Sequence, residues 1–181
     1  MTFLSDERDE LYSNEYGSCA YVAGAIRVVT DNFDMALYNA GVHYEALAGD
    51  VFSIDGLDEI SIKKHIKERV SNLVAENITE ELDVELEKMK INNTHMPMQE
   101  TIFEYYKDRI DCDKDKIKDA IEKYSKDVEY YLGKAKNVYE ADNETLDMCG
   151  LVSNSYLGIL FNLMFVEYEK HMLMFVHGSC E

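Results

Sequence analysis

Proline and tryptophan are almost missing from this chain, and glycine is sparse. The 181 residues include one proline, nine glycines and no tryptophan. Because proline and glycine interrupt helices and strands, their scarcity favours long regular elements and argues against a loop-rich β-sandwich. With 46% apolar and 30% charged residues, the composition is that of a globular protein that can bury a core of its own.

The sequence also lacks the patterns that indicate export, membrane insertion or a cysteine-based metal site. The four cysteines, Cys19, Cys112, Cys149 and Cys180, include no Cys-x-x-Cys pair. The first residues have no basic segment followed by an apolar one, which a signal peptide needs. The most apolar stretch, 150–166, is shorter than the roughly 20 residues of a membrane-spanning helix and contains serines and asparagines. We therefore expect a cytoplasmic protein without a membrane segment.

Basic residues are scarce, above all in the first third of the chain. The whole sequence has 36 acidic residues against 18 Lys and Arg, a formal net charge of -18. Residues 1–60 hold twelve of the acids and only two bases, Arg8 and Arg27. Repulsion among so many like charges does not stabilise a fold, although a high net charge helps solubility. The asymmetry therefore predicts an acidic surface that serves a cationic partner.

Hydrophobic periodicity favours helices along most of the chain. Apolar residues recur at three- and four-residue steps over 19–48 and again over 115–139. The segment 144–176 is apolar nearly all round in its middle, which is typical of a central buried helix. Residues 49–58 predict a loop, with room for a short strand near 51–54. The chain 1–181 is thus predicted to be a single all-α domain, a bundle of about six helices around the C-terminal one.

One segment has the ligand spacing of a calcium-binding EF-hand loop. The oxygen ligands of such a loop would be Asp111, Asp113, Asp115, Asp119 and Glu122, together with a backbone carbonyl. The sixth position, where the sharp turn needs glycine, is a lysine, and two further lysines within the loop would oppose a dication. A solvated helix start explains the pattern better, so calcium binding is kept only as an alternative.

No catalytic signature is present. The glycine motifs that bind phosphates or dinucleotides, and the one that carries a nucleophilic serine, are all missing. Glu167 and His171 would share a helix face, but no histidine has the Glu-x-x-His spacing of a di-iron bundle. Direct nucleic-acid binding is disfavoured, because the positive charge of the basic residues at 63–69 is offset by the acidic residues at 80–87. We therefore predict a protein that is not an enzyme and has no cofactor.

These observations predict an acidic protein that binds and inhibits a basic protein partner. Two forms fit: an immunity protein against a nuclease toxin, or a phage anti-defence protein that mimics DNA. The residues expected to contact the partner are acids of the first third and one tyrosine among them: Asp6, Glu7, Asp9, Glu10, Glu15, Tyr16, Asp50, Asp55, Asp58 and Glu59. The alternatives are a calcium-type metal-binding protein or enzyme, and an adaptor subunit whose charge only keeps it soluble. The oligomeric state is left open.

Overall fold

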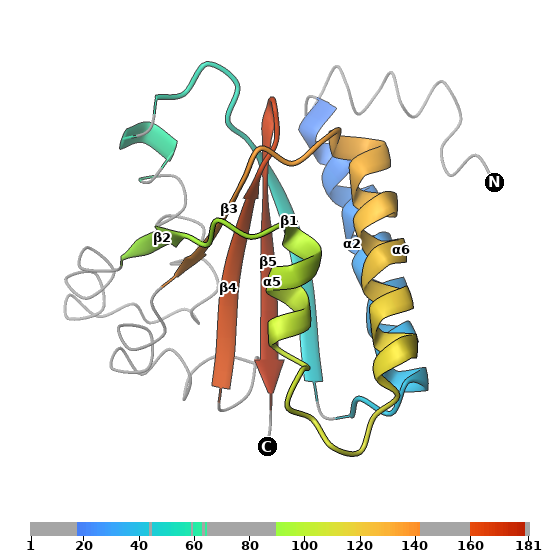
Figure 1. Cartoon of the computed structure of the whole chain (residues 1–181). Helices are drawn as coiled ribbons and strands as arrows, with labels where there is room; N and C mark the ends of the chain where they lie inside the picture. The colour runs from blue at the N-terminus through green and yellow to red at the C-terminus, as the bar shows by residue number, and fades with distance from the viewer. Residues whose placement is uncertain are drawn as a thin grey trace, which may run out of the picture.

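An antiparallel β-sheet, and not a helical bundle, organises this chain. The computed structural model describes residues 18–43, 45–58, 60–62, 64, 90–141 and 160–179. Five antiparallel strands pair in the order β1-β5-β4-β3-β2 (Figure 1). They are β1 (Glu45–Ser53), β2 (Ile91–Asn93), β3 (Asn137–Ala141), β4 (Leu160–Glu167) and β5 (His171–Ser179). The prediction of an all-α bundle of about six helices is therefore wrong, and the short strand placed near 51–54 is the end of the longer β1.

Three helices supply side chains to a core on one face of this sheet. They are α2 (Ser18–Asn39), α5 (Met98–Glu104) and α6 (Lys114–Leu132), which are joined to the sheet in one cluster of buried residues. The helices α2 and α6 lie side by side (Figure 1), and α2 also packs along β1. At the centre of the core the ring of Phe33 stacks on that of Tyr124, with 4.6 Å between centroids, and both lie near Phe175 of β5.

The hairpin of β4 and β5 lies in the middle of the sheet and is buried on both faces. On the side of the helices, Val166 pairs with Leu173, and both belong to the core cluster. On the other side, Phe165 pairs with Met174, and these side chains are no more than 2% exposed although they lie outside that cluster. A strand buried on both faces has a nearly continuous apolar sequence.

This double burial is the reason that the prediction of a buried helix over 144–176 is wrong. A continuous apolar run is compatible with a buried helix and with a buried strand, so periodicity alone does not separate them. The polar residues Glu167, Glu169 and Lys170 lie at the turn of the hairpin, where the Tyr168 N–H donates to the carbonyl oxygen of His171 at 2.8 Å. Residues 144–159 of the predicted helix lie outside the described residues.

Two glycines end the helices earlier than the periodicity suggests. After α2, Gly41 has a φ of 92° and its N–H donates to Tyr38, while the N–H of Val42 reaches back to the carbonyl of Leu37 at 3.0 Å. This pair of bonds is the Schellman motif, which glycine permits because it has no Cβ. Gly133, with a φ of 83°, ends α6 in a similar place. The helices predicted over 19–48 and 115–139 therefore end at 39 and 132, and each is followed by a strand.

The contact between α2 and β1 is unusually close at one position. A Cβ added to Gly49 of β1 would clash with the Thr30 hydroxyl oxygen of α2. That hydroxyl donates to the carbonyl of Ile26 at 2.9 Å and lies 3.3 Å from the Tyr124 hydroxyl. The missing side chain of Gly49 thus lets α2, α6 and β1 meet at one buried polar point. Within the described part of the chain, no helix combines the length and apolar character needed to cross a membrane.

Candidate functional site

Seven of the ten residues predicted to contact a partner lie outside the described residues. These are Asp6, Glu7, Asp9, Glu10, Glu15, Tyr16 and Glu59. The other three follow one another along β1 and the turn after it. Asp50 lies 3.7 Å from the guanidinium of Arg27, whereas Asp55 and Asp58 are exposed. The Asp58 carboxylate accepts a hydrogen bond from the Ser61 N–H at 2.8 Å, which lowers the pKa of Asp58.

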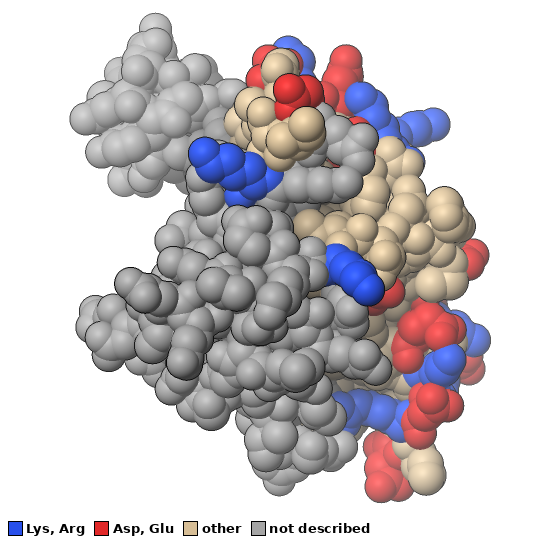
Figure 2. Space-filling model, turned by 90° about the vertical axis from the view of Figure 1, so that its left-hand side faces the viewer, with Lys and Arg blue, Asp and Glu red and all other residues tan. Residues whose placement is uncertain are grey.

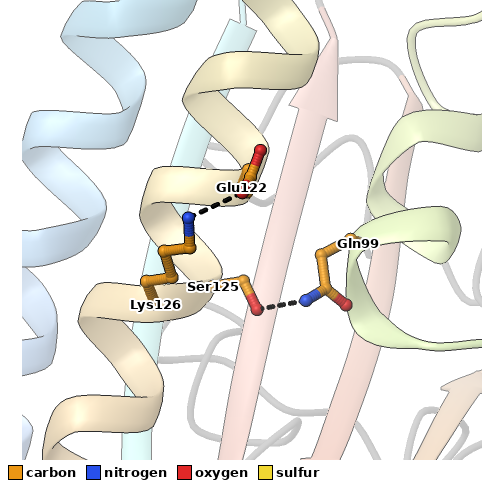
Figure 3. A network of polar contacts seen from close by, with 4 residues as sticks. All are labelled: Gln99, Glu122, Ser125 and Lys126. Atoms are coloured by element: carbon orange, nitrogen blue, oxygen red, sulfur yellow. Dashed lines mark hydrogen bonds and ion pairs between the residues drawn. The ribbon is translucent and has the colours of Figure 1, made fainter.

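Four lysines of the described residues pair with acids on their own segment. Ion pairs join Lys107 to Glu104, Lys116 to Asp113, Lys123 to Asp127 and Lys126 to Glu122, each between residues three or four apart. The Glu122 pair is drawn in Figure 3, and Figure 2 shows acidic and basic side chains interspersed over the described part of one face. Among the described residues, the ion pair with Arg27 is the only one made by an acid of the first sixty positions.

The candidate calcium ligands belong to the beginning of α6 and not to a metal-binding loop. Asp113 is the N-cap of that helix and accepts a hydrogen bond from the Lys116 N–H at 3.2 Å. Asp115, Asp119 and Glu122 lie within the helix itself, while Asp111 precedes it in a bend. Over the described ranges, no three His, Cys, Asp or Glu residues are grouped so that they could hold a metal ion. The twelve-residue loop that the spacing suggests is thus mostly helical.

Glu167 and His171 also have a different setting from the one the sequence suggested. They lie at the two ends of the turn between β4 and β5, not on one helix face. One carboxylate oxygen of Glu167 accepts hydrogen bonds from Asn137 at 2.8 Å and from the Tyr139 hydroxyl at 3.0 Å. Glu167 therefore ties β4 to β3.

This carboxylate belongs to a chain of hydrogen bonds that reaches the edge strand β2. The side-chain oxygen of Asn137 accepts a hydrogen bond from the side-chain amide of Asn93 at 3.4 Å. The side-chain oxygen of Asn93 in turn accepts one from the backbone N–H of His95 at 2.8 Å. His95 has a φ of 56°, in the left-handed region that only a few per cent of residues other than glycine adopt. The hydrogen bonds hold the β2–α5 loop in this conformation.

A pocket of about 560 Å³ lies beside that loop. The beginning of β3, the β2–α5 loop and the last turn of α6 meet around it, and its lining includes His95, Gln99, Glu129, Lys136 and Asn137. Gln99 is fixed in place because its amide nitrogen donates to the hydroxyl of Ser125 on α6 at 2.6 Å, as Figure 3 shows. The pocket is therefore bordered by charged groups of both signs and by an oriented amide.

A second cluster of polar groups surrounds His177 on β5. Its imidazole stacks on the ring of Tyr105, with 5.0 Å between centroids, and meets the edge or face of Tyr106 at 5.2 Å. The side-chain amide of Asn162 lies 3.3 Å from Nδ1 of His177. Burial, with the nearby charge of Arg109, lowers the pKa of His177 to about 4. The imidazole is thus neutral near pH 7 and acts here as a packed core group.

Sequence reasoning missed the pocket, because its residues come from separate parts of the chain. Periodicity describes each segment alone and does not show that 93–99, 129 and 135–138 converge. The sequence holds one local signal, because Asn92-Asn93-Thr94 and Pro97 are typical of a loop between regular elements. Comparisons with protein-family models, with curated proteins and with solved structures gave no match to this chain.

Proposed function

We propose that this protein binds a cationic protein through acids of its first third and thereby inhibits it. The observation that carries the proposal is the uncompensated charge of that region, with twelve acids and two bases in sixty residues. Four lysines of the 104–127 region pair with acids of that same region and not with the acids of the first third. Asp31 and Asp55, for example, are exposed and have no ion pair among the described residues.

An acidic surface of this kind acts mainly on the rate of association. Complementary charge steers a basic protein toward its binder and can raise the association rate constant to about 10⁸–10⁹ M⁻¹s⁻¹ at low salt. A nuclease or another DNA-binding protein is the natural target, since its own basic cleft already attracts phosphates. The immunity and DNA-mimic forms share this physics. They differ in whether the inhibitor covers the cleft of a toxin or that of a defence enzyme.

The test compares two variants that lose the same number of negative charges. The first replaces the early acids with amides, as Asp6→Asn, Glu7→Gln, Asp9→Asn and Glu10→Gln. The matched control changes acids of the locally neutralised region, as Glu104→Gln, Asp119→Asn, Glu122→Gln and Asp127→Asn. Affinity capture from lysate at low salt, followed by stopped-flow association with the captured protein, measures the effect. We expect the first variant to associate about tenfold more slowly, with a dissociation rate close to that of the wild type.

The control variant should associate with the captured protein almost as fast as the wild type does. Capture should be lost at high salt, and duplex DNA should compete if the target is a nucleic-acid-binding protein. Equal association rates for the two variants would show that the early acids are not the contact surface. Capture of no basic protein at low salt would remove the proposed function itself.

A further inference from the structure

Groups of both charges line the pocket beside the β2–α5 loop. Lys136 is the residue before β3, and His95 belongs to the β2–α5 loop. Glu129 belongs to the last turn of α6. All three residues are exposed. The cationic and hydrogen-bond-donating groups of the pocket therefore come from other elements than its carboxylate.

These charged groups have no other role in the described part of the chain. Neither Lys136 nor Glu129 forms an ion pair there, and they do not pair with each other across the pocket. Their backbone groups are used, since the Lys136 N–H donates to Glu167 and the Glu129 carbonyl accepts from Gly133, but their side chains are not. This contrasts with α6 and the loop before it, where lysines of the 107–126 region pair with acids three or four residues away.

The Gln99 side chain and the His95 backbone are held in place before any ligand arrives. The amide nitrogen of Gln99 is held by Ser125, so its carbonyl oxygen is left as an acceptor. His95 is held by the hydrogen bond from its N–H to Asn93, in a backbone conformation that costs energy. Residues held in strained conformations by their surroundings concentrate at binding sites, where preorganisation lowers the cost of binding.

Apolar side chains complete the lining. Met98 is buried, and Val138 lies on the same strand as the polar Asn137. The buried hydroxyl of Tyr168 donates to the sulfur of Met98 at 3.8 Å, a weak acceptor, and burial raises the pKa of Tyr168, helped by the charge of Glu129. A volume of about 560 Å³ falls within the range of small-molecule sites. The lining thus combines a few apolar side chains with charged groups of both signs.

We propose that this pocket binds a small zwitterion of the amino-acid type. The ligand carboxylate lies against Lys136 and the imidazole N–H of His95. The ligand ammonium group lies against the carboxylate of Glu129 and the carbonyl oxygen of Gln99, and a short apolar side chain faces Met98 and Val138. Charge-assisted hydrogen bonds at both ends give the site its selectivity, because a ligand with only one charged end leaves the pocket's charged group of the other sign unused. This binding site does not depend on the proposed function.

The experiment is an NMR titration of the full chain with glycine, L-alanine and L-methionine, following the side-chain amides of Asn93, Gln99 and Asn137. Acetate and methylammonium serve as ligands with one charged end only. We expect the zwitterions to shift these signals with dissociation constants in the millimolar range or below, and each half-ligand to bind at least about tenfold more weakly. Glu129→Gln should weaken the zwitterions about tenfold and leave acetate unchanged, while Lys136→Met should weaken both.

Two exposed residues outside the lining provide matched controls. Lys134→Met and Glu100→Gln remove one charge of each sign near the pocket, and both should bind glycine as the wild type does. The two-dimensional NMR spectrum shows at once whether each variant is folded. Acetate that binds as tightly as glycine, or glycine binding that survives Glu129→Gln, would overturn the proposal in favour of a plain anion site. The absence of any shift with all three amino acids would overturn it entirely.

Discussion

His177 is a titratable residue placed where its charged form is not tolerated. The imidazole is 4% exposed and lies against the rings of Tyr105 and Tyr106. The charge near it does not favour protonation, because the guanidinium of Arg109 is itself cationic. Burial and Arg109 therefore keep the pKa of His177 at about 4, below the ordinary value of 6.5.

The unfolded chain takes up a proton at His177 before the folded protein does. Between pH 6.5 and about 4 the unfolded state binds more protons at this residue, so the free energy of unfolding falls as the pH is lowered through this window. The full shift corresponds to a loss of about 3 kcal/mol. Urea unfolding at a series of pH values will measure it, with His177→Gln as the reference. The variant should lose less stability between pH 6.5 and 4.5, and an equal slope in both proteins would contradict this explanation.

At the scale of elements, the sequence predicted the helices α2 and α6 but not where they stop. The stripes Ile26, Phe33 and Leu37 in α2 and Ile117, Ile121 and Tyr124 in α6 are buried, as the helical period requires. The ends depend on Gly41 and Gly133, whose positive φ angles are visible only in the folded backbone. Glycine within a helix is also tolerated at moderate cost, so a single sequence does not show which glycine ends one.

Most of the strand residues were missed for a related reason. Once a helix is extended past Gly41 or Gly133, the first residues of β1 and β3 are counted as its final turns, and only the end of β1, near 51–54, is predicted as a strand. β4 and β5 have no alternation to reveal them, because both of their faces are buried. The register that pairs Val51 of β1 with Leu173 of β5 is a long-range property. The pocket could not be predicted from the sequence for the same reason, because it forms only when β2, β3 and α6 are in their final positions.

Gly49 allows a test of how closely α2 and β1 are packed. In Gly49→Ala, the new Cβ meets the Thr30 hydroxyl, and Thr30 is held by Ile26 and Tyr124. We expect the free energy of unfolding to fall by about 2 kcal/mol, in the range of overpacked cores. Gly24→Ala, where a Cβ would meet nothing within 4 Å, is the control and should not destabilise α2. A double-mutant cycle with Thr30→Ala, measured in urea, should give a coupling energy above zero, and additive effects would rule out the clash.

At the scale of the whole molecule, the negative charge opposes compactness. With a formal net charge of -18 on 181 residues, the acidic side chains repel one another. The locally paired lysines reduce this repulsion mainly within their own segment. Raising NaCl from about 20 to 200 mM at pH 7.5 should therefore increase the free energy of unfolding, by about 1 kcal/mol. Urea midpoints at several salt concentrations will measure the effect.

The two charge variants described above refine this prediction. Removing the charges of Asp6, Glu7, Asp9 and Glu10 should reduce the increase in the free energy of unfolding that NaCl produces. These acids lie in the first sixty residues, which contain only two bases to offset their repulsion. Removing Glu104, Glu122 and Asp127 charges also breaks local ion pairs and should relieve less repulsion. A protein whose stability falls with added NaCl would show that attractive pairs outweigh the net charge.

The position of β5 between β1 and β4 has a consequence for synthesis on the ribosome. Among the described strands β1 pairs with β5 alone, and β5 is translated more than a hundred residues later. Until then the apolar residues of β1 have no strand beside them, and β4 has no second neighbour. Nascent chains arrested before His171 therefore expose two incomplete strand edges, which makes them substrates for chaperones and prone to aggregate. The pairing of the described strands is therefore completed in one late step, when β5 leaves the exit tunnel and pairs with both β1 and β4.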